Sequence, residues 1–329
     1  MPEQEAATRS KNFDEVACGY HPDDALRESE RCLMCPDQPC VSGCPVGINI
    51  PGFIQKVNEK DLRGAYDILT QTSLLPAICG RVCPQENQCE GECTVGQSLE
   101  AVAIGRLERF VGDTAIREGW ANIPYIEKNG FKVGIVGSGP AGMACAADMA
   151  KAGCDVTVFE AFHQAGGVLK YGIPDFRLPN PVIDAEIANL RKLGVKFECN
   201  TLVGRLFTLE QMISEMGFDA VFVGVGAGYP TTLGIPGDSL HGVLSANELL
   251  TRCNQLRHAA AHWKTRRHCR RRQHGDGCHA RLGSPRRREG LLRLPSFAER
   301  SAGTGRGTPP RKRRRRRISL ADASDRHPQ

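Results

Sequence analysis

Residues 132–160 read KVGIVGSGPAGMACAADMAKAGCDVTVFE, and this stretch decides the fold of the region around it. The apolar run at 133–136 predicts a short buried strand, residues 140–152 predict a helix, and the apolar run at 156–159 predicts a second strand. Parallel strands need a crossover connection, commonly a helix, so this βαβ unit predicts a parallel sheet.

The loop between the first strand and the helix has the pattern of a dinucleotide site. Its glycines let the backbone approach a pyrophosphate at the helix N-terminus, and the acid that ends the next strand can accept a hydrogen bond from a ribose. The residues predicted to bind the cofactor are Gly137, Gly139, Pro140, Ala141, Gly142 and Glu160. The alternative is a tight βα turn without a ligand. The loop itself does not distinguish FAD from NAD.

Further elements extend this domain to residue 256. Helices are predicted over 181–193 and 209–216. Strands are predicted over 195–198 and 220–225, the second of them buried. Residues 130–256 are therefore predicted to form an incomplete α/β Rossmann-like domain.

The region ahead of this domain, residues 21–125, predicts short helices between cysteine-bearing loops. Pro51 suits the first turn of one helix, and Asp61 suits the N-cap of another. Residues 99–116 have the apolar spacing of a helix. Residues 1–20 are polar and are predicted to form a flexible arm.

Eight cysteines of the helical region fall into two groups of four. Their spacings are Cys32-x2-Cys35-x4-Cys40-x3-Cys44 and Cys79-x3-Cys83-x5-Cys89-x3-Cys93. Eight thiolates can hold two cubane iron–sulfur clusters, and short spacings let one loop supply several ligands of a cluster. Structural zinc is an alternative, but it favours paired CxxC or histidine ligands, and one CxxC and one nearby histidine, His21, are present. Inert buried thiols are a further alternative.

The composition changes near residue 256. Residues 257–329 contain 20 Arg and 2 Lys against 5 acidic residues, which leaves a net charge of −11 for residues 1–256. Leu, Ile, Val and Phe supply 7 of these last 73 residues, below the roughly one-fifth typical of a chain that can bury a core. Residues 257–329 are therefore predicted to be disordered, and the acidic body gives no reason to expect nucleic acid there.

The sequence shows no secretory signal pattern and no run of about 18 apolar residues. This predicts a cytoplasmic protein without a membrane partner. In that reducing compartment, clustered cysteines bind metal or do redox work more often than they form disulfides.

Three cysteine-region segments carry a resemblance to a known family. They are CLMCPDQPCVSGCPVGINIPGFI at 32–54, LPAICGRVCPQENQCEGEC at 75–93 and AVAIGRLERF at 101–110. Together they resemble the N-terminal domain shared by the small (beta) subunit of NADPH-dependent glutamate synthase, the large subunit of the NADH-dependent reduced ferredoxin:NADP oxidoreductase, and dihydropyrimidine dehydrogenase. The resemblance covers residues 12–256. It implies an α-helical double iron–sulfur cluster domain followed by a truncated Rossmann-like FAD-binding domain.

The resemblance also implies how two [4Fe-4S] clusters share the cysteines. One cluster would take Cys32, Cys35, Cys40 and Cys93. The other would take Cys44, Cys83 and Cys89, together with a non-cysteine side chain on the following helix, which falls on Glu108. Cys79 would then be a bystander. By pattern alone, Glu108 is an ordinary acid on the surface of a helix.

The same resemblance selects FAD as the cofactor of the βαβ unit. The segments GGVLKYGIP at 166–174 and RLP at 177–179 are similar to family segments that lie along the flavin. They add Gly167, Leu169 and Arg177 to the predicted FAD-binding residues. GVGAG at 224–228 resembles the later flavin-domain turn and adds Gly226, although a structural turn of glycines has the same sequence.

The family continues with an NADPH-binding domain, which cannot be read in residues 257–329. If each codon is read one nucleotide later, the genetic code permits WKTRRHCRRRQHGDGCHA at 263–280 to encode GKRVVIVGGGNTAMDAM, a strand followed by a Gly-rich loop. We therefore hypothesise a one-nucleotide frame change between about residues 256 and 263, which sequencing of the DNA across that junction tests.

A rival interpretation makes the Arg-rich tail an arm that binds nucleic acid. Residues 311–317 are seven consecutive basic residues, which could neutralise phosphates. However, out-of-frame coding of a GC-rich gene also produces Arg, Gly and Pro, and aromatic residues for stacking on bases are scarce. No specific nucleic-acid partner is therefore predicted.

The resemblance as a whole implies an oxidoreductase that oxidises NADPH with FAD and sends electrons through two [4Fe-4S] clusters to a glutamate synthase large subunit or an analogous redox partner. A competing assignment is a subunit of an electron-bifurcating ferredoxin:NADP transhydrogenase. An assignment of a different class is a truncated cluster-binding fragment without catalysis. The residues of such a protein place the cofactors and tune them, so no catalytic side chain is predicted.

Overall fold

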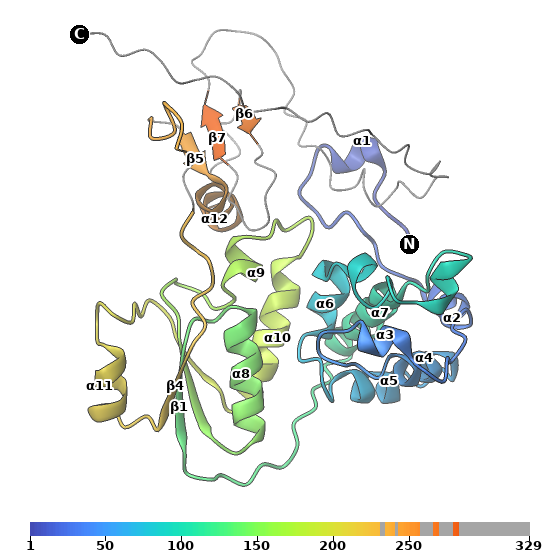
Figure 1. The fold of residues 1–329 in the computed structure, drawn as a ribbon, viewed down its shortest axis with the longest axis horizontal. Coiled ribbons are helices and arrows are strands. Elements are labelled where there is room, and N and C mark those ends of the chain that lie inside the picture. The colour runs from blue at the N-terminus through green and yellow to red at the C-terminus, as the bar shows by residue number, and fades with distance from the viewer. Residues whose placement is uncertain (231–233, 241–242, 257–265, 270–278, 283–329) are drawn as a thin grey trace, which may run out of the picture. The chain divides into compact units, whose positions relative to one another are not determined.

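The computed structural model describes residues 1–230, 234–240, 243–256, 266–269 and 279–282. These residues form a helical part followed by an α/β part, as Figure 1 shows. The frame change hypothesised between 256 and 263 lies outside the described residues. Most of residues 257–329, where the sequence predicts disorder and no readable NADPH-binding domain, also lie outside the described residues.

The helical part consists of short helices joined by the cysteine-bearing loops. Its elements are α1 (Ala6–Arg9), α2 (Pro22–Ser29), α3 (Pro39–Ser42), α4 (Ile50–Asn58), α5 (Leu62–Leu69), α6 (Pro76–Val82), η1 (Gln85–Asn87), η2 (Thr94–Gln97) and α7 (Ile104–Arg117). Its core gathers apolar side chains mainly from α4, α5 and α7, among them Phe53, Ile54, Leu69 and Leu107.

The local signals for helix starts are confirmed in two places. Pro51 lies in the first turn of α4, and the Asp61 side chain caps α5 by accepting a hydrogen bond from Gly64 N. The helix predicted over 99–116 begins later than its apolar spacing suggests. Val102 is buried but precedes the helix, which starts at Ile104.

The α/β part carries the predicted parallel sheet. Its elements are β1 (Lys132–Val136), α8 (Pro140–Lys151), β2 (Asp155–Phe159), α9 (Val168–Tyr171), α10 (Asn180–Lys192), β3 (Lys196–Glu198), α11 (Leu209–Ser214) and β4 (Ala220–Val223). The four strands are parallel in the order β3-β2-β1-β4, and α8 packs on β1 and β2. Leu75 and Ile78, from the start of α6, join the core beneath α8 and α10.

Strand β4 is not the buried strand that its apolar sequence predicts. It ends the sheet next to β1, and its residues Phe222 and Val223 are 38% and 52% exposed. An edge strand has a neighbour on one side only, so an apolar run can form a strand without being covered.

Residues 1–20, predicted to be a flexible arm, make specific contacts with both parts. The Glu15 carboxylate accepts a hydrogen bond from Arg81 Nε at 2.8 Å and pairs with Arg109 Nη2 at 3.1 Å. Val16 N donates to Phe176 O at 3.1 Å. The polar composition of the arm does not reveal these contacts, because the ion-pair partners lie far away in sequence. The flexibility of the arm stays a prediction.

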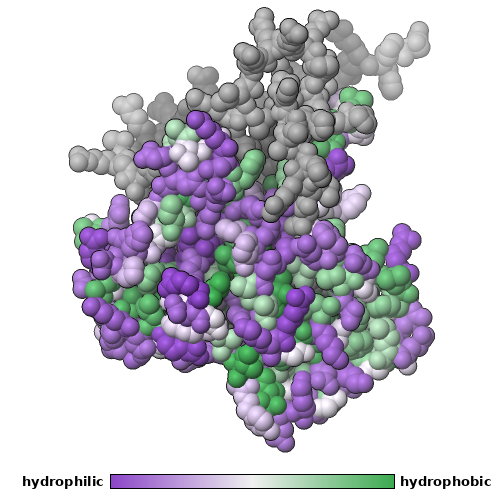
Figure 2. Space-filling model, turned by 180° about the vertical axis from the view of Figure 1, so that it is seen from behind, coloured by the Kyte–Doolittle hydropathy of each residue, from purple (hydrophilic) through white to green (hydrophobic). Residues whose placement is uncertain are grey.

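The last described elements are β5 (Val243–Ser245), α12 (Ala246–Leu256), β6 (Arg266–Cys269) and β7 (His279–Leu282). The three strands form an antiparallel sheet in the order β5-β7-β6, which the sequence analysis does not anticipate. Among the described residues, no helix has the length and apolar character needed to cross a membrane. The face drawn in Figure 2 is mostly hydrophilic with scattered hydrophobic patches.

Candidate cluster and flavin sites

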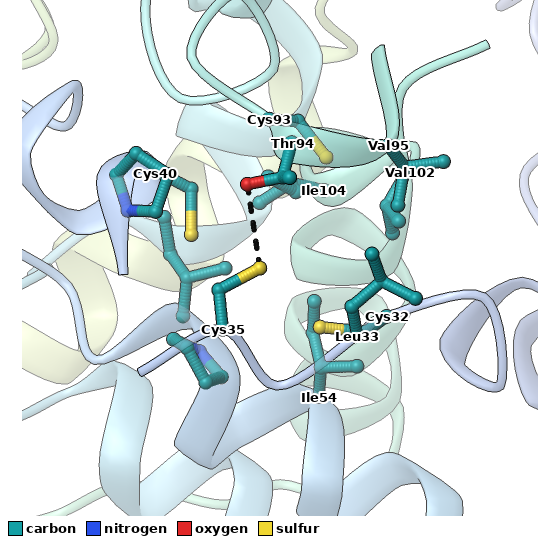
Figure 3. Close-up of a pocket in the computed structure, with 13 residues that line it drawn as sticks. Cys32, Leu33, Cys35, Cys40, Ile54, Cys93, Thr94, Val95, Val102 and Ile104 are labelled. Carbon is teal, nitrogen blue, oxygen red and sulfur yellow. Dashed lines mark hydrogen bonds between the residues drawn. The ribbon is translucent and has the colours of Figure 1, made fainter. Parts of the chain in front are cut away.

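Four cysteines from two segments surround one pocket of the helical part. Cys32, Cys35, Cys40 and Cys93 line this pocket, and Figure 3 shows their side chains around it. Most of the remaining wall is apolar and comes from Leu33, Ile50, Ile54, Val95, Val102 and Ile104. An enclosed, apolar site with four thiols is the chemistry of an iron–sulfur cluster site. These four are the set that the resemblance implies for one cluster.

The loop that carries three of these thiols is bent at two points. Between Cys32 and Cys40, Met34 and Gln38 adopt left-handed backbone conformations with φ of +49° and +44°. Such conformations are uncommon for these residue types, and they turn the chain around the pocket. Cys93, at the N-cap of η2, supplies the fourth thiol from a distant part of the sequence.

Burial disfavours the charged form of these thiols when no cation is present. Desolvation, and to a smaller extent the neighbouring cysteines, raise the pKa of Cys32 and raise that of Cys40 to about 11. A bound cluster would supply the positive charge that converts thiols to thiolates. Cys35 Sγ lies 3.3 Å from Thr94 Oγ1, the contact dashed in Figure 3.

The second set of predicted ligands lies where α6 packs along α7. Cys83 is the C-cap of α6, and Glu108 lies on the buried side of α7. The two helices pack tightly at Gly80, where a Cβ atom would lie 2.5 Å from Arg109 N and 2.6 Å from Gly105 O. A glycine is therefore needed at this crossing, and it brings the two ligand-bearing helices together.

Glu108 is buried, contrary to the surface position that its sequence pattern suggests. The residue is 6% exposed, and Ser73 Oγ lies 3.4 Å from its Oε1 atom. Burial raises the pKa of the Glu108 carboxyl well above its usual range, and Cys83 raises it further. Among the described residues, no positively charged side chain shifts this pKa. Because buried carboxylates are paired with cations or bind metals, this residue suits a cluster iron.

Cys79 and Cys83 lie four residues apart on the same side of α6. Hydrogen bonding with Cys79 lowers the pKa of Cys83 to about 7, and the same contact raises the pKa of Cys79. Two thiols that share a hydrogen bond titrate as a pair, and one thiolate in such a pair forms more readily than two. Burial raises the pKa of Cys89 to about 12, and Glu108 and Cys44 act on it from nearby. The second predicted set is thus gathered in one region.

Neither set is arranged to chelate a single ion. Within the described parts of the chain, no three Cys, His, Asp or Glu side chains converge closely enough for one metal ion. The first four thiols instead stand around a pocket. This arrangement suits a polynuclear group, whose ligands bind at separate corners.

The carboxyl ends of three strands meet at one edge of the parallel sheet. Val136 at the end of β1 pairs with Phe159 of β2 and with Val223 of β4. The loop after β1, the acid Glu160 after β2 and the glycine turn at 224–228 are therefore brought to the same edge. This edge is where open α/β sheets bind their ligands.

Two glycines of the loop have opposite surroundings. A Cβ atom at Gly142 would lie 1.9 Å from Gly137 O, so the tight turn into α8 excludes any side chain there. A Cβ atom at Gly139 would meet no atom within 4 Å, so the loop is open to a ligand at this point. Pro140 and Ala141 are exposed in the first turn of α8, where free N–H groups favour an anion.

The Glu160 carboxylate already accepts hydrogen bonds from the protein. It accepts from Ser138 N at 3.0 Å, from the Ser138 hydroxyl, and from Phe162 N at 2.9 Å. A carboxylate offers about four acceptor positions, which leaves one for a ribose hydroxyl. Ser138 also accepts from Gly166 N at 2.9 Å and is fully buried. Sequence reasoning missed this serine, whose only signal is its place between two loop glycines.

The remaining predicted flavin residues are not all brought to the loop. Gly167 lies beside it, since a Cβ atom there would lie 2.6 Å from Gly139 Cα, and Gly226 lies in an open turn after β4. The Leu169 side chain is buried in the core, which leaves only its backbone for a cofactor. Burial and the charge of Arg109 lower the pKa of Arg177, so this guanidinium lies towards the helical part.

Comparison with known proteins assigns both parts of the chain. Residues 9–120 match the family described as dihydropyrimidine dehydrogenase domain II, 4Fe-4S cluster. Residues 131–269 match the pyridine nucleotide-disulphide oxidoreductase family.

Individual relatives support the same assignment. The NADPH glutamate synthase small chain of Halomonas elongata is 38% identical over 76% of this chain, and that of Escherichia coli K12 is 36% identical over 74%. The NAD-dependent dihydropyrimidine dehydrogenase subunit PreT of Escherichia coli O157:H7 is 38% identical over 66% of this chain. The matched region covers 53%, 52% and 52% of these three proteins, so the chain spans about half their length.

Proposed function

The chain belongs to the iron–sulfur and flavin oxidoreductases that include the glutamate synthase small chains and PreT, and from this premise we propose that it holds two [4Fe-4S] clusters and FAD and serves electron transfer from NADPH to a partner protein. When bound, FAD exchanges electrons in pairs and the clusters exchange them singly. The chain's own residues would bind these groups, exclude water and tune them.

The pocket formed by Cys32, Cys35, Cys40 and Cys93 is the observation that carries the proposal. Three thiols from residues 32–40 and a fourth from the distant Cys93 line one largely apolar cavity, although ordinary packing does not require any of them to be a cysteine. Burial raises the pKa values of Cys32 and Cys40, so the site disfavours their thiolate forms until a positive group binds. In the proposal these four hold the first cluster.

The second cluster would be held by Cys44, Cys83, Cys89 and Glu108. The support is the buried carboxyl of Glu108, which has no cation partner in the described part of the chain, and its position near Cys83. The close approach of α6 and α7 at Gly80 keeps these two ligands together.

FAD would bind at the carboxyl edge of the parallel sheet. Gly139 leaves the loop open, the first turn of α8 offers N–H groups to the pyrophosphate, and Glu160 retains an acceptor position for a ribose hydroxyl. Binding of NADPH would require residues other than those described. We therefore propose the NADPH step for the family's full-length form.

We propose a glutamate synthase large subunit as the partner, because glutamate synthase small chains match about three-quarters of this chain. A dihydropyrimidine dehydrogenase partner is the second candidate, favoured by the 38% identity with PreT. Mixing the purified chain with each partner separates the two. The true partner should co-elute with it and support either glutamate formation or pyrimidine reduction.

Anaerobic purification of the full chain tests the proposal. The protein should be brown and contain about eight iron and eight sulfide, as expected for two four-iron clusters. It should also retain or rebind FAD. Dithionite should reduce the clusters directly, whereas reduction by NADPH tests the nicotinamide step separately. A colourless protein with neither iron nor flavin would contradict the proposal.

A further inference from the structure

Ser73 is a buried serine beside the carboxyl group of Glu108. It is 3% exposed and lies in the loop between α5 and α6, where its backbone N–H donates to Leu69 O at 2.9 Å. Its hydroxyl Oγ lies 3.4 Å from Glu108 Oε1, and the pair joins segments 35 residues apart. No sequence motif marks Ser73.

The Ser73 hydroxyl also lies near a thiol of α6. Ser73 also acts on the pKa of Cys79, whose thiol contacts Cys83. Ser73 therefore lies between the bystander thiol and the carboxylate proposed as a ligand. A hydroxyl can donate one hydrogen bond, and an unpaired buried carboxylate oxygen is costly, so donation to Glu108 is the favourable arrangement.

We propose that Ser73 is the positioning residue of the carboxylate-ligated cluster: its hydroxyl donates to Glu108, fixes the direction of the carboxylate and raises the reduction potential of the cluster. The inference rests on the proposed function, because it takes Glu108 as an iron ligand. Outer hydrogen bonds of this kind orient metal ligands and tune the metal.

The direction of the effect follows from charge. One-electron reduction adds a negative charge to the cluster and its ligands. A hydrogen bond donated to the ligand carboxylate stabilises that added charge, and hydrogen bonding around a cluster is one of the factors that set its potential. Removal of the hydroxyl should therefore make reduction less favourable.

The test compares variants of the anaerobically purified full chain by redox titration with electron paramagnetic resonance. Glu108→Cys first identifies the signal of the carboxylate-ligated cluster, because only that signal should change. Ser73→Ala should keep about eight iron per chain. For the signal of the carboxylate-ligated cluster, it should lower the ratio of reduced to oxidised cluster at a fixed potential about three- to tenfold. A tenfold change corresponds to a shift of about 59 mV in the reduction potential.

Two variants control for structural damage. Ser73→Thr keeps the hydroxyl and should restore the wild-type potential. Ser29→Ala removes another fully buried serine of the helical part, which hydrogen-bonds Asn58 Oδ1 at 2.7 Å, and should shift neither signal. If Ser73→Ala loses iron, recovery of the cluster in Ser73→Thr supports the role of the hydroxyl, and failure to recover overturns it.

The outcomes separate this inference from the proposed function. If the ratio of reduced to oxidised cluster in Ser73→Ala stays within threefold of wild type while Glu108→Cys shifts one signal, the role of Ser73 is wrong and the ligation by Glu108 stands. If Glu108→Cys changes neither signal, Glu108 is not a ligand. The second proposed ligand set and the role of Ser73 then both fail.

Discussion

Replacement of Gly80 by alanine perturbs the crossing of α6 and α7, where the two helices pack tightly. The added Cβ atom would lie 2.5 Å from Arg109 N, 2.6 Å from Gly105 O and 2.7 Å from Arg109 Cα. All three are backbone atoms of α7, so no side-chain rotation can relieve the overlap. Helix α7 must move away from α6, and Glu108 moves with it.

The size of this movement sets the expected cost. Ordinary contact begins near 3.4 Å, so the helices must separate by about 1 Å over a well-packed surface that includes Ile78 and Leu107. Overpacking of this kind typically costs about 1–3 kcal/mol. Because the overlap is with backbone, we expect the upper end, about 3 kcal/mol of unfolding free energy.

Chemical unfolding and iron analysis test this expectation together. Gly80→Ala should lower the unfolding free energy and reduce iron from about eight to about four per chain, because the four thiols of the Cys32 pocket lie outside α6 and α7. Gly64→Ala is the control for iron content, because its Cβ meets only the Asp61 side chain. Turning that side chain away loses the cap of α5, so this variant should lose about 1 kcal/mol of stability and keep full iron. Wild-type stability within about 0.5 kcal/mol and full iron in Gly80→Ala would refute the argument.

Three further predictions concern the thiols, the arm and a buried acid. Cys35→Ser should lose one cluster, whereas Cys79→Ser should keep about eight iron, and loss of iron from the Cys79 variant would mean that the ligand assignment is wrong there. Glu15→Gln should lower the unfolding free energy in urea by about 2–4 kcal/mol. The guanidinium groups of Arg81 and Arg109 are only 4% and 5% exposed, and the variant leaves them with one carboxylate partner fewer. An unchanged urea midpoint would contradict that. Burial raises the pKa of the Glu186 carboxyl from 4.5 to about 8, so the folded protein holds a proton that the unfolded chain releases, and stability should fall as pH rises between these values. Glu186→Gln should remove this decline, which amounts to at most about 5 kcal/mol. Unfolding experiments at pH 5 and pH 8 measure it, and an identical pH dependence in wild type and variant would exclude Glu186 as its source.

Local signals in the sequence predicted the elements that depend on neighbouring residues. The capping role of Asp61, the first-turn position of Pro51 and the parallel pairing of β1 with β2 require only short-range chemistry and one βαβ unit. The Gly-rich loop after β1 was predicted for the same reason. Its open point at Gly139 is where the pattern expects a pyrophosphate.

Features that depend on distant contacts were not predictable in this way. Nothing in the local sequence of Glu108 indicates burial, which follows from the crossing of α7 with α6 at Gly80. The exposure of β4 follows from strand order, and the packing of the arm follows from the ion pairs of Glu15 with α6 and α7. Ser73 carries no motif, and its importance depends on a contact 35 residues away.

Iron, acid-labile sulfide and zinc analysis of the anaerobically purified chain tests the central claim most directly. Two clusters held by Cys32, Cys35, Cys40 and Cys93 and by Cys44, Cys83, Cys89 and Glu108 predict about eight iron and eight sulfide per chain. Stoichiometric zinc without sulfide, or a stable protein that binds neither iron nor sulfide, would contradict the account.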